Sequence, residues 1–152
     1  MGYRFRSRLE ARWAVYFDTL GIEWDYELQG FILGDLCYLP DFWLPQVCMW
    51  AEVKSVGLKP IEWEKCQRLA NESRHPVLML IGTPDLRSYW AIGSNLDGEI
   101  DLVDYILDSR YLNQNRFYAS TGSDYPERGD YTQGDREGIE KAVEAARSAR
   151  FE

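Results

Sequence analysis

The chain has 152 residues, 45% hydrophobic and 14% aromatic, a composition typical of one globular domain with a substantial core. Its net charge of −8 argues against a protein that coats nucleic acid nonspecifically, because such binding requires many Lys and Arg contacts to phosphate. The charge is uneven, since residues 1–12 hold four arginines and one glutamate. We expect this basic end to contact phosphate through Arg4, Arg6, Arg8 and Arg12.

The cysteines and the histidine restrict the metal chemistry. Cys37, Cys48 and Cys66 form no C-x-x-C pair, which excludes a zinc site or a four-cysteine iron–sulfur cluster, and we expect reduced thiols. His75 is the only histidine, so nucleases and proteases that need several histidines are excluded, and we expect a structural role for it. No apolar run reaches membrane-spanning length and no secretory signal is present, so we expect a cytoplasmic protein without a membrane partner.

Residues 7–20 have apolar side chains at broadly helical spacing and are followed by Gly21, which predicts a first helix. Glu10 precedes Trp13 by three positions and Phe17 by seven, so it is expected on the inward stripe rather than on the arginine-bearing face. The alternative for this glutamate is an ion pair with an arginine one helical turn away.

Several strand-like runs follow the first helix. Residues 24–28, 31–33 and 36–39 are rich in apolar side chains between glycines, which suggests a meander that leads into a strand ending at Asp41. Residues 46–55 form a second apolar run after the Pro45 turn, and the two runs are expected to lie side by side.

Three charged residues interrupt these apolar runs. Side chains alternate along a strand, so Glu52 and Lys54 should project together while Val53 points the other way into apolar packing. If the two strands pair, Asp41 joins them. Buried unpaired charges are costly unless they neutralise one another or hold a metal. Two carboxylates with a backbone carbonyl and waters make a hard oxygen site, which favours Mg²⁺ or Mn²⁺.

The sequence Pro40-Asp41, followed after ten residues by Glu52-Val53-Lys54, resembles the motif of the PD-(D/E)XK nuclease superfamily, over about residues 4–92. The resemblance implies an α/β, restriction-endonuclease-like core, with a central mixed β-sheet flanked by helices. It implies that Asp41, Glu52 and the Val53 carbonyl bind Mg²⁺. It also implies that Lys54 orients and helps to deprotonate the attacking water, and that Glu10 supports the metal.

Residues 61–73 predict a second helix, with Trp63, Cys66, Leu69 and Ala70 facing inward. Its edges carry Lys65 and Gln67. In nucleases that this chain resembles, the corresponding helix often lends a Gln or Lys to the site, so Gln67 is a candidate catalytic residue; a solvated helix edge is the alternative. Strands are expected at residues 76–81 and 89–92, which completes an α/β sheet.

The C-terminal third is less patterned. Residues 100–112 are apolar with no clear period, and residues 122–138 predict a polar, Gly-rich connection. A last helix is expected at 136–150, where Ile139, Val143 and Ala146 form a narrow stripe that docks on the domain or on a second copy. We therefore expect a nuclease-like domain at 1–122 and an appended loop and helix at 123–152.

Together these expectations describe a Mg²⁺-dependent nuclease that hydrolyses DNA. Because no sequence-reading motif is present, it should recognise the structure of DNA rather than its sequence, in recombination, repair or mobile-element processing. Cutting of branched DNA would require two active sites, hence a homodimer or a larger nucleoprotein assembly. One alternative is a catalytically silent DNA-binding or assembly subunit with the same fold. Another is a structural α/β protein in which Glu52 and Lys54 form a surface ion pair.

Overall fold

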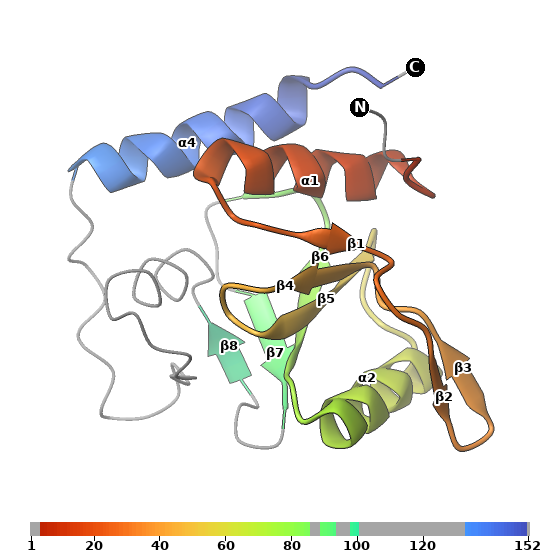
Figure 1. Cartoon of the computed structure of the whole chain (residues 1–152). Coiled ribbons are helices and arrows are strands. Elements are labelled where there is room, and N and C mark those ends of the chain that lie inside the picture. Colours follow the sequence, from red (N-terminus) through yellow and green to blue (C-terminus); the bar gives the residue numbers. More distant parts are fainter. Residues whose placement is uncertain (1–3, 86–88, 94–97, 101–132, 152) are drawn as a thin grey trace.

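The computed structural model describes residues 4–85, 89–93, 98–100 and 133–151. Within these ranges the chain forms three helices and eight strands (Figure 1). In chain order they are α1 (Arg8–Leu20), β1 (Asp25–Tyr26), β2 (Phe31–Leu33), β3 (Leu36–Tyr38), β4 (Phe42–Leu44), β5 (Met49–Lys54), α2 (Pro60–Ser73), β6 (Val77–Ile81), β7 (Tyr89–Ile92), β8 (Gly98–Ile100) and α4 (Gln133–Ser148).

Six strands make one mixed sheet in the order β1-β4-β5-β6-β7-β8. Strands β5 and β6 run parallel, with Glu52 opposite Met79, and the other neighbours are antiparallel. A parallel pair needs a crossover connection, and α2 provides it. The predicted α/β class with a mixed sheet is therefore confirmed.

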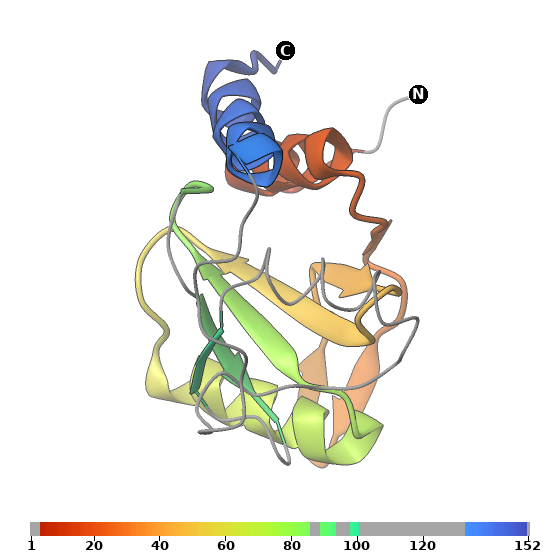
Figure 2. The same cartoon turned by 90° about the vertical axis from the view of Figure 1, so that its left-hand side faces the viewer.

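Helices cover the two faces of this sheet, with α1 and α4 on one side and α2 on the other (Figure 2). Two buried clusters fill the spaces between the layers, one under each set of helices. Val53 is buried in the cluster on the α1 side, while Trp50, three residues earlier on β5, belongs to the α2 side. Alternation along β5 thus sends Glu52 and Lys54 away from the α1 cluster, as the sequence predicts.

Helix α1 confirms the first predicted helix and explains its limits. The Ser7 hydroxyl accepts a hydrogen bond from the Glu10 amide at 3.1 Å, which caps the helix start. Gly21 ends the helix at a φ of 73°, a left-handed conformation that glycine adopts readily. Trp13 and Phe17 have no exposed surface, so Glu10 lies on the buried stripe with them.

The predicted meander into Asp41 is wrong in one respect. Within the described part of the chain, strand β3 ends at Tyr38 and pairs with β2 alone, so these two strands form a separate hairpin whose turn contains Gly34 at a φ of 67°. Pro40 follows the hairpin and has no N–H to donate to a ladder, which favours the end of the strand before it. Asp41 therefore lies directly before β4 rather than at the end of a strand.

The C-terminal helix starts earlier than expected. Residues 133–135, predicted only as part of a polar connection, belong to α4, which ends at Ser148. Sequence reasoning weighted the Gly and polar residues of this stretch, but helix packing overrides such local preferences. The expectations for residues 101–112 and 122–132 lie outside the described residues.

The stripe on α4 packs on the domain itself. Ile139, Val143 and Ala146 are buried in the same cluster as Trp13. Figure 1 shows α4 lying alongside α1. This confirms docking on the domain and makes the stripe unavailable to a second copy, so the candidate dimer contact at these residues is wrong.

Candidate active site

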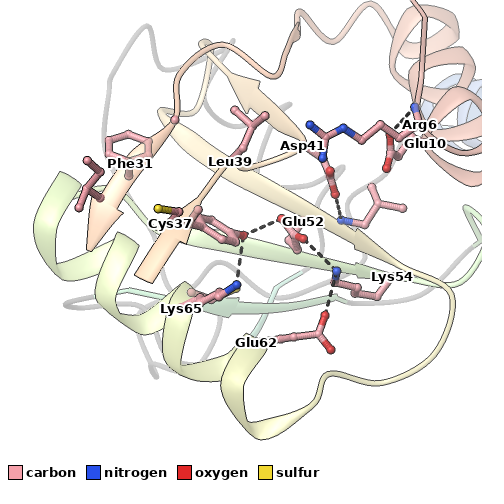
Figure 3. Close-up of a pocket in the computed structure, with 15 residues that line it drawn as sticks. Arg6, Glu10, Phe31, Cys37, Leu39, Asp41, Glu52, Lys54, Glu62 and Lys65 are labelled. Atoms are coloured by element: carbon pink, nitrogen blue, oxygen red, sulfur yellow. Dashed lines mark hydrogen bonds and ion pairs between the residues drawn. The ribbon is translucent and has the colours of Figure 1, made fainter. Parts of the chain in front are cut away.

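A pocket of about 670 Å³ opens beside the start of β4, where β5 continues past it (Figure 3). Its walls come from the start of α1, the β2–β3 hairpin, β5 and α2. The lining residues include four acids and three bases, namely Glu10, Asp41, Glu52 and Glu62 with Arg6, Lys54 and Lys65. The motif residues found in the sequence therefore share one open pocket.

Asp41 is fixed by the strand that carries the other motif residues. Its side chain is only 8% exposed, and Oδ2 accepts a 2.8 Å hydrogen bond from the Val53 amide. The Asp41 carbonyl accepts a second backbone bond from Glu27 at 2.9 Å. Because β4 pairs with β5 only as far as Phe42, the Asp41 carboxylate takes the place of the next ladder partner.

The Val53 carbonyl is placed by the same arrangement. In a sheet the N–H and C=O of one residue point to the same side of the strand. The Val53 N–H faces Asp41, whereas the next carbonyl, that of Lys54, faces β6 and accepts from Gly82 at 2.8 Å. The Val53 carbonyl is thus directed to the Asp41 side, beyond the start of β4.

Glu52 is held by one group from each side of the pocket. Its Oε2 accepts a 2.6 Å hydrogen bond from the Tyr38 hydroxyl on the hairpin, and its Oε1 lies 3.3 Å from Lys54 Nζ. The Glu52 side chain is 9% exposed. The charged pair that the alternation predicts is therefore present, with Glu52 buried and the Lys54 side chain 34% exposed.

Lys54 is also bound by an acid that the sequence motif does not contain. Its Nζ lies 2.8 Å from Glu62 Oε2, on the first turn of α2. Glu62 Oε1 accepts from the Lys59 amide at 3.0 Å, which completes a capping arrangement and fixes the side chain. Burial alone lowers the pKa of Lys54, but the Glu62 hydrogen bond and the Glu52 charge outweigh it and raise that pKa. Lys54 is therefore an ammonium ion at neutral pH.

Glu10 reaches the pocket from α1. Its Oε2 accepts hydrogen bonds from the Tyr26 hydroxyl at 2.5 Å and from the Arg6 amide at 3.2 Å. The Arg6 side chain instead pairs with Glu27 at 2.6 Å. The alternative of an arginine ion pair is thus not what holds Glu10, which is 7% exposed and faces the same pocket as Asp41.

Burial raises the pKa of the two acids at the centre of the pocket, Asp41 and Glu52, so both carboxyl groups resist ionisation. The pKa of Asp41 rises from 3.8 to about 8, first because the group is desolvated and then because Glu52 is negative. Burial also raises the pKa of Glu52, although hydrogen bonds from Tyr38 and Lys54 oppose the rise. Two adjacent carboxyls that resist ionisation together form a site that a cation would stabilise.

The donors fit a hard divalent cation. Asp41, Glu52 and the Val53 carbonyl offer only oxygen atoms, the ligand type of Mg²⁺ and Mn²⁺. Among the residues that the structure describes, no three His, Cys, Asp or Glu side chains gather as a metal-binding group. A cation here would therefore rest on two carboxylates and a carbonyl, with Glu10 engaged by Tyr26.

Other predicted residues lie elsewhere. Gln67 is exposed and does not line the pocket, whereas Lys65 on the opposite edge of α2 does. The Arg12 guanidinium donates to three carbonyls at the end of α4, at 2.6, 2.8 and 3.3 Å, so its role as a phosphate contact is replaced by a structural one. Arg6 lines the pocket, and Arg4 and Arg8 are exposed.

Sequence reasoning missed Tyr26, Tyr38 and Glu62. Each is distant in sequence from the acid or lysine that it contacts, so no local spacing reveals it. The only available signal was for Glu62, which follows Pro60 at the start of a predicted helix. The three cysteines are free thiols, as expected.

Comparisons of the chain with protein-family models, with curated proteins and with solved structures found no match.

Proposed function

We propose that this protein is a Mg²⁺-dependent nuclease of the PD-(D/E)XK type that hydrolyses DNA. The observation that carries the proposal is the convergence of Asp41, Glu52 and Lys54, from two neighbouring strands, on one open pocket. The hydrogen bond from the Val53 amide to Asp41 locks the two strands in this register. A purely structural ion pair between Glu52 and Lys54 would not require the other two buried acids, Asp41 and Glu10, or an open pocket.

The order of the elements supports the same proposal. A helix bearing the buried Glu10 precedes the strands, β5 carries Glu52 and Lys54, and α2 connects β5 to the parallel strand β6. This arrangement resembles the restriction-endonuclease-like core that the sequence motif implies.

The residues of the pocket have different roles in the proposed hydrolysis. Asp41, Glu52 and the Val53 carbonyl would hold the cation, and Glu10, whose Oε2 is engaged by Tyr26, would support it from the wall of the pocket. When bound, Mg²⁺ supplies positive charge beside the scissile phosphate and lowers the pKa of a water molecule. Lys54, kept protonated by its two acidic partners, orients the water and stabilises negative charge that develops on the phosphate.

The basic start of the chain provides contacts to DNA on either side of the cleaved bond. Arg6 lines the pocket, and Arg4 and Arg8 are exposed nearby in sequence. Contacts of this kind fix the position of the DNA backbone without reading its sequence. Recognition by DNA structure, rather than sequence, follows from such a surface.

Cleavage of labelled linear, flapped and branched DNA, with Mg²⁺ or with EDTA, tests the proposal. Asp41→Asn keeps an acceptor for the Val53 amide while removing the charge, and Glu52→Gln and Lys54→Met remove the other two charges. Glu72→Gln, an exposed acid on α2 outside the pocket, is the matched control. We expect Mg²⁺-dependent cleavage by the wild type and the control alone. DNA binding without cleavage by the wild type would identify the silent subunit instead.

A further inference from the structure

We propose that the nucleotide at the active site is unpaired, and that its base occupies an apolar half of the pocket formed by the β2–β3 hairpin. This inference rests on the proposed nuclease function and names its substrate class. It predicts that DNA must expose a nucleotide outside the base stack in order to be cut.

Charged and apolar lining residues of the pocket come from different elements of the fold. The seven charged lining residues all come from outside the β2–β3 hairpin: from the start of α1 and the residues before it, from the position before β4, from β5 and from α2. The hairpin half is lined by Gly30, Phe31, Ile32, Cys37, Tyr38 and Leu39, none of which is a charged residue, and the Tyr38 hydroxyl is taken up by Glu52. Figure 3 shows Phe31 and Cys37 at one end of the pocket and Asp41, Glu10 and Arg6 at the other, with Lys65 of α2 near Cys37.

The apolar half of the pocket has exposed side-chain surface that is accessible to a ligand. Ile32 is 80% exposed and sits opposite Cys37 in the hairpin register, so both lie on one face of the hairpin. The opposite face is anchored, because Leu33 is buried and Phe31 packs edge-on against Trp50 at 5.2 Å. The hairpin therefore combines a fixed position with an exposed apolar rim.

A nucleotide matches both halves at once. Its phosphate belongs with the cations of the charged half, and its base has apolar faces that stack on aromatic and aliphatic side chains. The volume of about 670 Å³ lies within the range of small-ligand pockets. In a duplex the base faces are covered by their neighbours, so only a base outside the stack can enter. An apolar protein partner would leave the adjoining charged half without a counterpart.

The first test compares cleavage of a fully paired duplex with cleavage of the same duplex carrying an unpaired flap. Ile32→Ser removes the apolar rim, and Leu28→Ser is the matched control, because Leu28 is 54% exposed but does not line the pocket. We expect the wild type to prefer the flap and Ile32→Ser to lose about tenfold on the flap only, the effect of roughly one stacked base. Equal wild-type cleavage of both substrates, or equal loss in both variants, would overturn the inference.

The second test needs no cleavage. Cys37 is exposed at the apolar half, while Cys48 does not line the pocket and serves as the internal reference. Iodoacetamide labelling of the wild type without metal, read by peptide mass spectrometry, should be slowed at Cys37 by a single-stranded oligonucleotide but not by a blunt hairpin duplex. Unchanged Cys37 labelling in the presence of saturating oligonucleotide would refute the base site. A wild type that cuts nothing with Mg²⁺ would instead refute the nuclease function, so the two failures are distinguishable.

Discussion

The Tyr38 hydroxyl donates a 2.6 Å hydrogen bond to Glu52 Oε2, which ties the β2–β3 hairpin to the central acid of the pocket. Burial, together with the charge of Glu52, raises the pKa of Tyr38, so the phenol remains a proton donor. Tyr26 bonds to Glu10 in the same way. Glu10 and Glu52 are thus each oriented by a tyrosine hydroxyl, and only Oε1 of Glu52 remains beside Lys54.

Replacing Tyr38 by Phe should weaken Mg²⁺ binding while preserving the packing of the ring. Groups that orient a metal ligand typically change metal affinity by about 10-fold to 100-fold when removed. Calorimetric titration of Mg²⁺ without DNA measures the change. Tyr89→Phe is the control, because this buried phenol accepts from the Asp85 amide away from the pocket. Equal Mg²⁺ affinity in the two variants would contradict the role of Tyr38.

The stability of the metal-free protein should fall as pH rises. The pKa of Asp41 is about 8 in the fold against an ordinary value of 3.8, so the folded state binds the extra proton between these values. The contribution of protonated Asp41 to the free energy of unfolding is therefore complete below about pH 4 and is lost as pH rises through about 8. Mg²⁺ should offset this loss, so it should raise the melting temperature more at about pH 8 than at about pH 5.

Thermal melts across this pH range, with Mg²⁺ and with EDTA, measure the effect. Asp41→Asn cannot ionise and should flatten the pH dependence in EDTA. It should also remove most of the stabilisation by Mg²⁺. A steep loss of stability that persists unchanged in Asp41→Asn would show that another group is responsible.

The sequence predicted the central residues of this site because they are close along the chain. Asp41, Glu52 and Lys54 fall on two consecutive runs, and strand alternation alone places two of them together. Alternation could not place Tyr38 or Glu62, because their contacts depend on how the hairpin and α2 sit on the sheet. Those positions are set by tertiary packing.

The choice between Gln67 and Lys65 shows the same limit. Both residues flank the buried stripe of α2, but on opposite edges, and the helical period is symmetric about that stripe. Which edge of α2 lines the pocket depends on how α2 is placed beside β5. In the structure the edge that carries Lys65 lines the pocket. The hairpin was misplaced for a related reason, since apolar composition predicts strands but does not say which sheet they join.

Glu62→Gln should slow cleavage without weakening Mg²⁺ binding. The Glu62 carboxylate contacts Lys54 but neither Asp41 nor the Val53 amide, so its loss frees the ammonium group and leaves the cation ligands in place. We expect a decrease of about tenfold in kcat at saturating Mg²⁺, since one charge-assisted contact is worth on the order of 1.5 kcal/mol. Glu64→Gln removes an exposed ion pair with Arg68 on the same helix and is the control. A parallel loss of Mg²⁺ affinity would show that Glu62 acts on the metal site instead.

The arginines of the basic end should separate into two classes. Arg12 closes the C-terminal end of α4 through three carbonyl contacts, so Arg12→Ala should cost about 2 kcal/mol of stability, or about 4–8 °C in melting temperature. Arg8 is exposed, so Arg8→Ala should leave the melting temperature unchanged. It should instead weaken DNA binding and reduce the slope of log affinity against log salt by about one.

Melting curves and salt-dependent DNA binding, measured on both variants and in EDTA to prevent cleavage, check this division. Arg12→Ala should keep the wild-type salt slope at temperatures where it is folded, because its guanidinium is already engaged by α4. A reduced salt slope in Arg12→Ala with an unchanged melting temperature would place Arg12 on the DNA path. An unchanged slope in Arg8→Ala would move the phosphate path away from the exposed face of α1.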